Sequence, residues 1–204
     1  MLADRPVSVG IAVTASQRLF QATFGIPLCV LLAGCASTTV TLTPPDPLAV
    51  CDRSAAALVV WAPQWRPDQK DVAQREESAA AGLKDFLATS DCFARSELRR
   101  IPDLAPATVR AQTTTNGQFT RVVAIGVREL GPTVKLLSSA ALVEGGTEVV
   151  IQVSVHSVPG AIQAREFTVH WRNGGPGVVK GVASLASDVQ AALRAGLQAG
   201  AVAK

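Results

Sequence analysis

The sequence predicts an α+β protein with one open mixed sheet and helices on one face, in the order β-α-β-α-β-β-β-β-α. The first observation is an apolar run over 57–62 (ALVVWA), followed by a helical pattern over 71–89 and an alternating run over 93–101. This succession predicts a strand–helix–strand crossover, whose two strands are parallel. The second is a series of strand-like runs over 121–171, separated by glycine and proline turns, which predicts antiparallel strands. A last helical pattern follows them.

The first 34 residues predict a leader that is not part of the fold. Arg5 and Arg18 precede an apolar run over 19–30, and small residues follow it. This is the layout of a secretory signal. A membrane-spanning helix needs about 20 apolar residues, whereas this run is shorter and interrupted. A core helix is also disfavoured, because Gly25 and Pro27 break helices.

The tetrapeptide Leu32-Ala33-Gly34-Cys35 resembles the lipobox of bacterial lipoproteins. In that family a diacylglycerol is attached to the cysteine thiol, a peptidase cuts before the cysteine, and the new amino group is acylated. The resemblance implies that Cys35, carrying palmitate-type chains, is the first residue of the mature protein. Acyl chains contribute about 0.8 kcal/mol per buried methylene group, so three chains anchor a protein permanently. Ala36, in place of aspartate, resembles the pattern of outer-membrane sorting.

The mature chain is long enough for one domain with a real core. Removing residues 1–34 leaves 170 of the 204 residues, with 17 basic against 15 acidic side chains. A nucleic-acid surface needs clustered cations. The nearest cluster is Arg95, Arg99 and Arg100, which Glu97 interrupts, so a solvated strand edge is the simpler interpretation and no nucleic-acid partner is expected.

The lipidated cysteine is expected to lead into a tether over 35–50, and the periplasmic domain to occupy 51–200. Residues 36–50 (ASTTVTLTPPDPLAV) are rich in threonine and proline and show no amphipathic period. Fifteen residues reach at most about 50 Å at ~3.3 Å per residue. The domain is therefore expected to stay close to the membrane.

The first helix is expected to begin at Asp71, with Gln74 placed as its capping-box partner. It runs to about Thr89, and its apolar stripe consists of Val72, Ala79, Leu83, Phe86 and Leu87. A short second helix is expected over 103–112, with Pro106 in its first turn. The last helix is expected to start near Ser184 or Ser187, with Leu185, Val189, Leu193 and Leu197 as its stripe.

Four strands are expected between these last two helices: Arg121–Glu129, Val134–Val143, Thr147–Ser157 and Ile162–Trp171. The first is apolar almost throughout, which predicts a central strand. Gly131-Pro132, Gly145-Gly146 and Pro159-Gly160 are expected to form the turns between them.

Two cysteines remain in the mature domain, Cys51 and Cys92. Because an exported chain meets an oxidising compartment, a disulfide between them is expected; two buried free thiols are the alternative. Each cysteine precedes one strand of the parallel pair, so both lie at the same edge of the sheet if those strands are neighbours. Closing the ~40-residue loop contributes about 4 kcal/mol in the chain-entropy model.

The sequence lacks the usual patterns of catalysis, cofactor binding or metal binding. In the glycine-rich stretch 174–181, Val179 stands where a phosphate loop needs a glycine before Lys180. His156 is expected opposite about residue 163, which places His170 some seven residues, roughly 24 Å, further along the hairpin. The two histidines therefore cannot share a metal. No serine lies in a nucleophile elbow, and Glu166 and Asp188 have no partner identifiable from the sequence.

Trp65 lies in a polar loop between prolines and has two interpretations. A large apolar side chain in such a loop is often an anchor for a partner. The alternative is that Trp65 folds back over the sheet edge or the helix. Trp61 and Trp171 lie on strand faces and are expected in the core.

With the lipobox, the order of elements resembles the domain shared by the TolB amino-terminal domain, the curli-secretion lipoprotein CsgG and the penicillin-binding-protein activator lipoproteins. The stretches that carry this likeness are 57–62, 71–89, 93–101 and 122–127 (VVAIGV). The chain lacks a pore-forming insertion after Gly131, so no channel is implied. Its short tether also differs from the long linkers of the activators, which implies a partner near the outer membrane.

Together these features predict a non-catalytic outer-membrane lipoprotein whose domain faces the periplasm. Its predicted role is to bind another protein of an envelope assembly, such as a transport system. The alternative is an envelope protein that binds a small or lipidic molecule, and a hydrolase is the third hypothesis.

Overall fold

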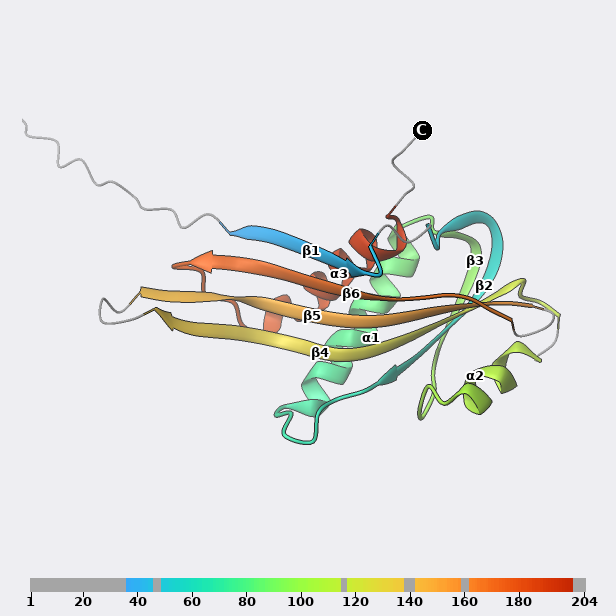
Figure 1. The fold of residues 1–204 in the computed structure, drawn as a ribbon, viewed down its shortest axis with the longest axis horizontal. Helices are drawn as coiled ribbons and strands as arrows, with labels where there is room; N and C mark the ends of the chain where they lie inside the picture. Colours follow the sequence, from blue (N-terminus) through green and yellow to red (C-terminus); the bar gives the residue numbers. More distant parts are fainter. Residues whose placement is uncertain (1–35, 46–48, 115–116, 138–141, 159–161, 200–204) are drawn as a thin grey trace, which may run out of the picture. The chain divides into compact units, whose positions relative to one another are not determined.

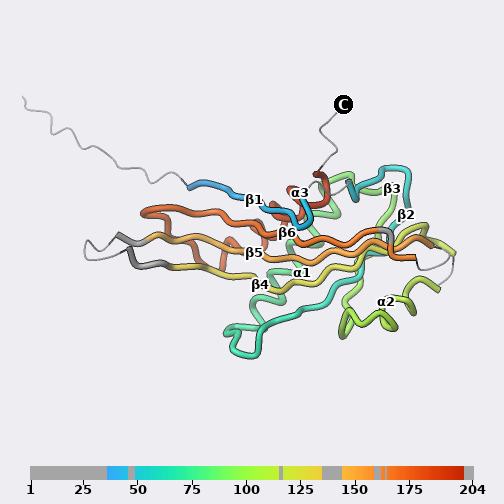
Figure 2. The backbone as a smooth tube through the Cα atoms, in the orientation of Figure 1, coloured from blue at the N-terminus to red at the C-terminus, as the bar shows by residue number. Residues whose placement is uncertain are grey.

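The computed structural model describes residues 36–45, 49–114, 117–137, 142–158 and 162–199. The predicted leader and Cys35 lie outside these residues. Figure 1 shows the elements as a ribbon, and Figure 2 follows the backbone through them.

The described residues form one open mixed sheet of six strands in the order β1-β6-β5-β4-β2-β3, which confirms the predicted α+β class. β2 pairs parallel with β3 and with β4, whereas β1, β6, β5 and β4 pair antiparallel in that order. The crossover predicted from the first half of the chain is therefore present, and β4 is a central strand. The strands are β1 (Ser37–Thr43), β2 (Asp52–Pro63), β3 (Phe93–Arg100), β4 (Arg121–Leu137), β5 (Leu142–Ser157) and β6 (Ile162–Pro176).

In the described part of the chain, three helices accompany the sheet: α1 (Val72–Thr89), α2 (Pro106–Thr113) and α3 (Leu185–Leu197), the last preceded by a 3-10 turn at Val182–Ser184. The main core lies between the sheet and α1 and α3, where Phe86 and Leu193 are fully buried against residues such as Val123. α1 and α3 approach closely at Gly82, which has no side chain: a Cβ there would lie 2.5 Å from the carbonyl oxygen of Ala186.

α2 lies on the opposite face of the sheet, which differs from the expectation that all helices share one face. Its Val109 packs in a second cluster with Leu58 and Val60 of β2 and Val122 of β4. The reason is visible in β2, where residues 55–62 are all apolar and all but Ala56 are buried. A strand that is apolar at every position requires cover on both faces.

The segment predicted as a tether contains a strand of the sheet. β1 pairs with β6 from Ser37↔Gly174 to Thr43↔Thr168, and Leu42 packs against the main core. Threonine and valine favour strands. Within 37–43, however, only Val40 and Leu42 are apolar at alternate positions. Two residues are too few to establish a period in the sequence. The strand forms because β6 presents a free edge with which this segment pairs.

Gly131-Pro132 and Gly145-Gly146, predicted as turns, lie inside long strands. They lie in successive rows of the β4–β5 pair, where Pro132 is opposite Thr147 and Gly146 is opposite Thr133. The strand predicted over Val134–Val143 is therefore not a separate strand: residues 134–137 continue β4 to its end at Leu137, and residues 142–143 begin β5. β2 pairs with β4 only as far as Val127, so Pro132 lies where β4 has become an edge, a position at which proline is tolerated.

The start of α1 also differs from the prediction. Asp71 is the N-cap residue, but its φ of 54° is left-handed and its side chain makes no capping hydrogen bond. The capping box with Gln74 is therefore absent. The first turn is instead held through Arg75, which donates hydrogen bonds to the carbonyl oxygens of Lys70 and Leu130.

Candidate functional site

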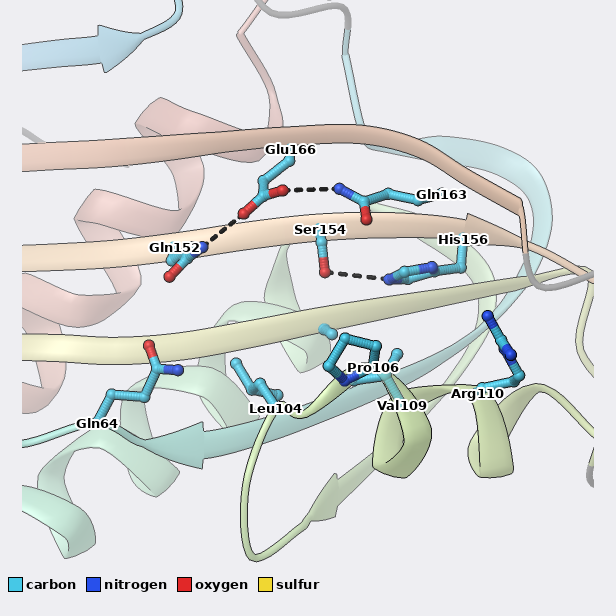
Figure 3. Close-up of a pocket in the computed structure, with 11 residues that line it drawn as sticks. Gln64, Leu104, Pro106, Val109, Arg110, Gln152, Ser154, His156, Gln163 and Glu166 are labelled. Atoms are coloured by element: carbon cyan, nitrogen blue, oxygen red, sulfur yellow. Dashed lines mark hydrogen bonds between the residues drawn. The ribbon is translucent and has the colours of Figure 1, made fainter.

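A groove of about 370 Å³ lies between α2 and the outer face of β4, β5 and β6 (Figure 3). One wall is polar and comes from the sheet, and the other is largely apolar and comes from α2 and the loop before it. Eleven described residues line it: Gln64, Leu104, Pro106, Val109, Arg110, Ala124, Gln152, Ser154, His156, Gln163 and Glu166.

The polar wall follows from the alternation of side chains along β5. Val149, Ile151, Val153 and Val155 face the main core, so Gln152, Ser154 and His156 face the opposite side, where the groove lies. Glu166 of β6 pairs with Ser154 in the sheet. Its carboxylate accepts hydrogen bonds from Gln152 Nε2 at 2.6 Å and from Gln163 Nε2 at 2.7 Å.

These two bonds fix the polar wall. A carboxylate that accepts from two amides holds both amide groups in place, and each amide keeps its oxygen for a further partner. Ser154 Oγ and His156 Nε2 lie 3.1 Å apart. The wall therefore presents a row of oriented donors and acceptors.

The apolar wall depends on the entry into α2. The carboxylate of Asp103 accepts a hydrogen bond from the Ala105 backbone N–H at 2.9 Å, which shapes the turn before the helix. That bond, followed by one from the Thr108 side chain, holds the pKa of Asp103 below its usual value. Pro106 then occupies the first turn, where its missing N–H costs nothing.

Gly126 lies beneath one end of the groove. A Cβ there would lie 2.4 Å from Oε1 of Gln64 and 2.9 Å from Cδ1 of Leu104. The absence of a side chain at Gly126 thus lets both residues lie directly on the sheet.

The groove brings a serine and a histidine side chain together. Ser154 and His156 are a possible nucleophile and base, but acyl transfer also needs N–H donors directed at the developing oxyanion. Ser154 lies in the middle of β5, which pairs with β4 on one side and β6 on the other. The backbone N–H of Ser154 is therefore engaged in the sheet and does not serve as such a donor.

Trp65 is half-buried in the loop after β2 and packs against the main core. Its indole Nε1 is buried and has no hydrogen-bond partner within the described part of the chain. Trp65 therefore folds back onto the domain, and its role as a partner anchor stays a prediction. Trp61 and Trp171 are buried, as predicted.

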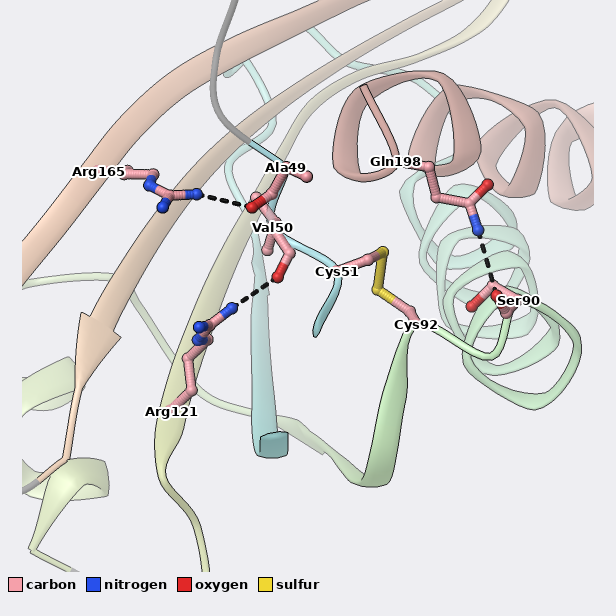
Figure 4. The surroundings of a disulfide bond; sticks show 8 residues. All are labelled: Ala49, Val50, Cys51, Ser90, Cys92, Arg121, Arg165 and Gln198. Carbon is pink, nitrogen blue, oxygen red and sulfur yellow. Dashed lines mark hydrogen bonds between the residues drawn. A yellow bond between two sulfur atoms is a disulfide. The ribbon is translucent and has the colours of Figure 1, made fainter. Parts of the chain in front are cut away.

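Cys51 and Cys92, the predicted pair, are joined by a disulfide (Figure 4). They precede the neighbouring parallel strands β2 and β3, as the sequence argument requires. The same segment is held by Arg121 Nη1, which donates to the carbonyl oxygen of Val50 at 2.7 Å. The backbone N–H groups of Val50 and Cys51 both donate to the carbonyl oxygen of Leu197 at the end of α3.

The remaining titratable candidates form separate pairs. His156 lies opposite Gln163, as predicted, while His170 pairs with Glu148 further along the hairpin. The buried carboxylate of Asp188 binds Lys180 Nζ at 2.7 Å, so that lysine is engaged. Among the described residues, no group of three or more histidine, cysteine, aspartate or glutamate side chains is arranged to hold a metal. In the same residues, no helix is long and apolar enough to cross a membrane.

The groove was missed in the sequence because its walls come from distant segments. The signal was the polar alternation Gln152, Ser154, His156 on a strand whose other face is apolar. Such an alternation is equally typical of a solvent-facing sheet surface, and nothing in the sequence indicates that α2 lies over it.

No protein-family model and no curated protein matches the chain. Solved structures that are similar include the PelC dodecamer from Paraburkholderia phytofirmans, with 18% identity, a TM-score of 0.39, and coverage of 77% of this chain and 95% of that one. Lipoprotein GNA1162 from Neisseria meningitidis has 12% identity and a TM-score of 0.37, covering 68% and 96%. Protein XCC0632 from Xanthomonas campestris has 14% identity and a TM-score of 0.35, covering 72% and 83%. With TM-scores this low, none of these similarities supports a conclusion about this chain.

Proposed function

We propose that the chain is a non-catalytic lipoprotein of the bacterial envelope, anchored in the outer membrane through Cys35, whose periplasmic domain binds a segment of a protein partner. The anchor rests on the lipobox resemblance, Leu32-Ala33-Gly34-Cys35. The binding role rests on the groove beneath α2.

The observation that carries the binding role is the pairing of a polar wall with an apolar one. The amides that Glu166 orients can bond the backbone of an extended peptide, whose groups require partners when they are buried. Val109 and Leu104 offer apolar contact to alternate side chains of the same segment.

A second candidate occupant is a small polar molecule. The groove volume of about 370 Å³ lies within the range of small-ligand sites, roughly 300–1,000 Å³. A lipid is not favoured, because such a ligand needs an enclosed apolar cavity, whereas most residues that line this groove are polar.

Site-specific photocrosslinking in intact cells tests the partner. A benzoylphenylalanine at Arg110, on the exposed side of α2, is expected to form a discrete protein adduct. The matched control carries the same probe at Lys84, an exposed position on α1 across the sheet, and is expected not to form it. Combining the Arg110 probe with Gln152→Ala and Glu166→Ala should abolish the adduct, because both substitutions dismantle the polar wall.

Three outcomes are informative. An adduct that survives the double substitution, or that also forms from Lys84, refutes binding in the groove. A small molecule that co-purifies in native mass spectrometry and is lost in the double variant supports the second candidate instead. If neither a protein adduct nor a bound molecule is found, the groove is not a binding site.

The anchor has an independent test. The amino-terminal peptide of the mature chain should begin at Cys35 and carry the mass of the acyl groups. Cys35→Ala should move the chain from the membrane fraction to the soluble periplasmic fraction. A wild-type chain that retains residues 1–34 would refute the anchor.

A further inference from the structure

One end of the sheet lies immediately beside the point where the described chain begins. Ser37 pairs with Gly174, Gly174 with Gly146, and Gly146 with Thr133, so these four residues form one row across β1, β6, β5 and β4. Val134 lies one residue beyond that row. In Figure 1, β1 begins at the end of the sheet where β4 and β6 finish.

Two exposed valines lie at this end, and we refer to Val134 and Val179 as the valine end. Val134 is 66% exposed and Val179 is 90% exposed. Val134 pairs with Gly145 in the sheet. A Cβ on Gly145 would lie 2.1 Å from the carbonyl oxygen of Val178, so the segment that leads into Val179 lies directly against this residue pair. Two of the six large apolar side chains that are exposed in the described residues therefore lie here.

The charges that are described near the valine end are paired. Glu144 contacts Arg172 at 3.2 Å, and Lys180 contacts Asp188 at 2.7 Å. Paired charges leave little local field to oppose contact with an apolar phase.

The distance to the anchor decides what covers this end. A free tether of fifteen residues would reach at most about 50 Å, but β1 incorporates residues 37–43 into the sheet. Only two residue steps, about 7 Å, then separate Cys35 from Ser37. Three strand spacings of about 4.8 Å separate β1 from β4, so Val134 lies about 15 Å to the side.

We propose that the valine end rests on the membrane surface in which Cys35 is anchored. The lipid anchor fixes one corner of the sheet at the bilayer, and the valines provide a second contact at the depth of the headgroups, as apolar residues of peripheral proteins do. The inference depends on the proposed anchor and adds an orientation of the domain: this end of the sheet faces the membrane.

The test uses the full-length acylated chain in vesicles of phosphatidylethanolamine and phosphatidylglycerol. A benzoylphenylalanine at Val179 is expected to form phospholipid adducts on illumination, detected by mass spectrometry. The matched control carries the probe at Ile162, which is 69% exposed but begins β6 at the opposite end of the sheet. Val134→Asp should lower the adduct yield at Val179 several-fold and leave the acyl mass on Cys35 unchanged.

The outcomes separate this inference from the anchor. Acylated Cys35 with no lipid adduct at Val179, or with equal adducts at Val179 and Ile162, overturns the orientation and leaves the anchor intact. A Cys35 that carries no acyl group overturns both. A crosslink from Val179 to a second copy of the chain, in place of lipid, assigns the valine end to a protein interface and also overturns the proposal.

Discussion

Removal of the Cys51–Cys92 disulfide is expected to cause a large loss of stability. The two residues are separated by 41 positions, and a closed loop of about that length contributes about 4 kcal/mol in the chain-entropy model. For a domain of this size, ~1 kcal/mol corresponds to about 2–4 °C in Tm, so reduction should lower the Tm by roughly 8–16 °C. The effect should extend to α3, because Val50 and Cys51 bind the Leu197 carbonyl oxygen.

Thermal and urea unfolding, followed by circular dichroism with and without a phosphine reductant, measures this loss. The Cys51→Ala, Cys92→Ala double variant is the matched control. It should unfold at the midpoint of the reduced wild type and should not respond to the reductant. Hydrogen exchange at the amides of Val50 and Cys51 should be faster in both reduced states.

Two results would refute the reasoning. A reductant effect on the wild type equivalent to less than about 1 kcal/mol would mean that the loop closure contributes little to stability. A double variant that still responds to the reductant would mean that the effect arises elsewhere. Thiol labelling of the unreduced protein, which should leave Cys51 and Cys92 blocked, checks the starting state.

Three further predictions concern packing and pH. Gly82→Ala should destabilise the domain by about 1–3 kcal/mol in urea unfolding, because the new Cβ would overlap α3. Gly181→Ala is the control: its Cβ would meet no atom within 4 Å, so its free energy of unfolding should stay within about 0.5 kcal/mol of wild type. Phe86→Ala should cost about 3–5 kcal/mol, because its fully buried ring leaves a cavity in the main core; a loss below 1 kcal/mol, about that of a surface change, would contradict the core. The hydrogen bond from the Ser54 side chain, followed by that from the Ser54 backbone, lowers the pKa of Asp52. Ionised Asp52 therefore adds to the free energy of unfolding above the ordinary aspartate pKa, and this contribution is lost as the pH falls through the lowered pKa. When the midpoint of urea unfolding is plotted against pH, Asp52→Asn should therefore weaken its fall at acidic pH. An unchanged fall would mean that protonation of Asp52 does not contribute to the acid sensitivity.

Elements with a clear hydrophobic period could be predicted from the sequence. α1 and α3 were predictable because their apolar residues recur at helical spacing and face one core. β2 and β4 were recognised as buried strands from unbroken apolar runs. The parallel arrangement of β2 and β3 followed from the helix between them, and it placed Cys51 and Cys92 together.

The errors arose where a local signal competed with pairing between distant segments. Gly131-Pro132 carries a strong turn signal, but β5 offers a continuous partner and the strand passes through it. β1 has only one apolar residue that packs against the core, Leu42, and its strand depends on the edge of β6. The candidate groove required the position of α2, which is set by the second apolar face of β2 and β4 and not by the sequence of α2 itself.

The pairing of β1 with β6 has a consequence for how the protein is made. Ser37 and Gly174 are 137 positions apart, so the first strand to leave the ribosome waits for nearly the whole polypeptide before its partner exists. A product truncated before residue 162 lacks β6 and leaves the backbone groups of β1 unpaired, a state prone to joining other chains. The arrival of β6 in the compartment where the domain folds is thus the event that closes this side of the molecule.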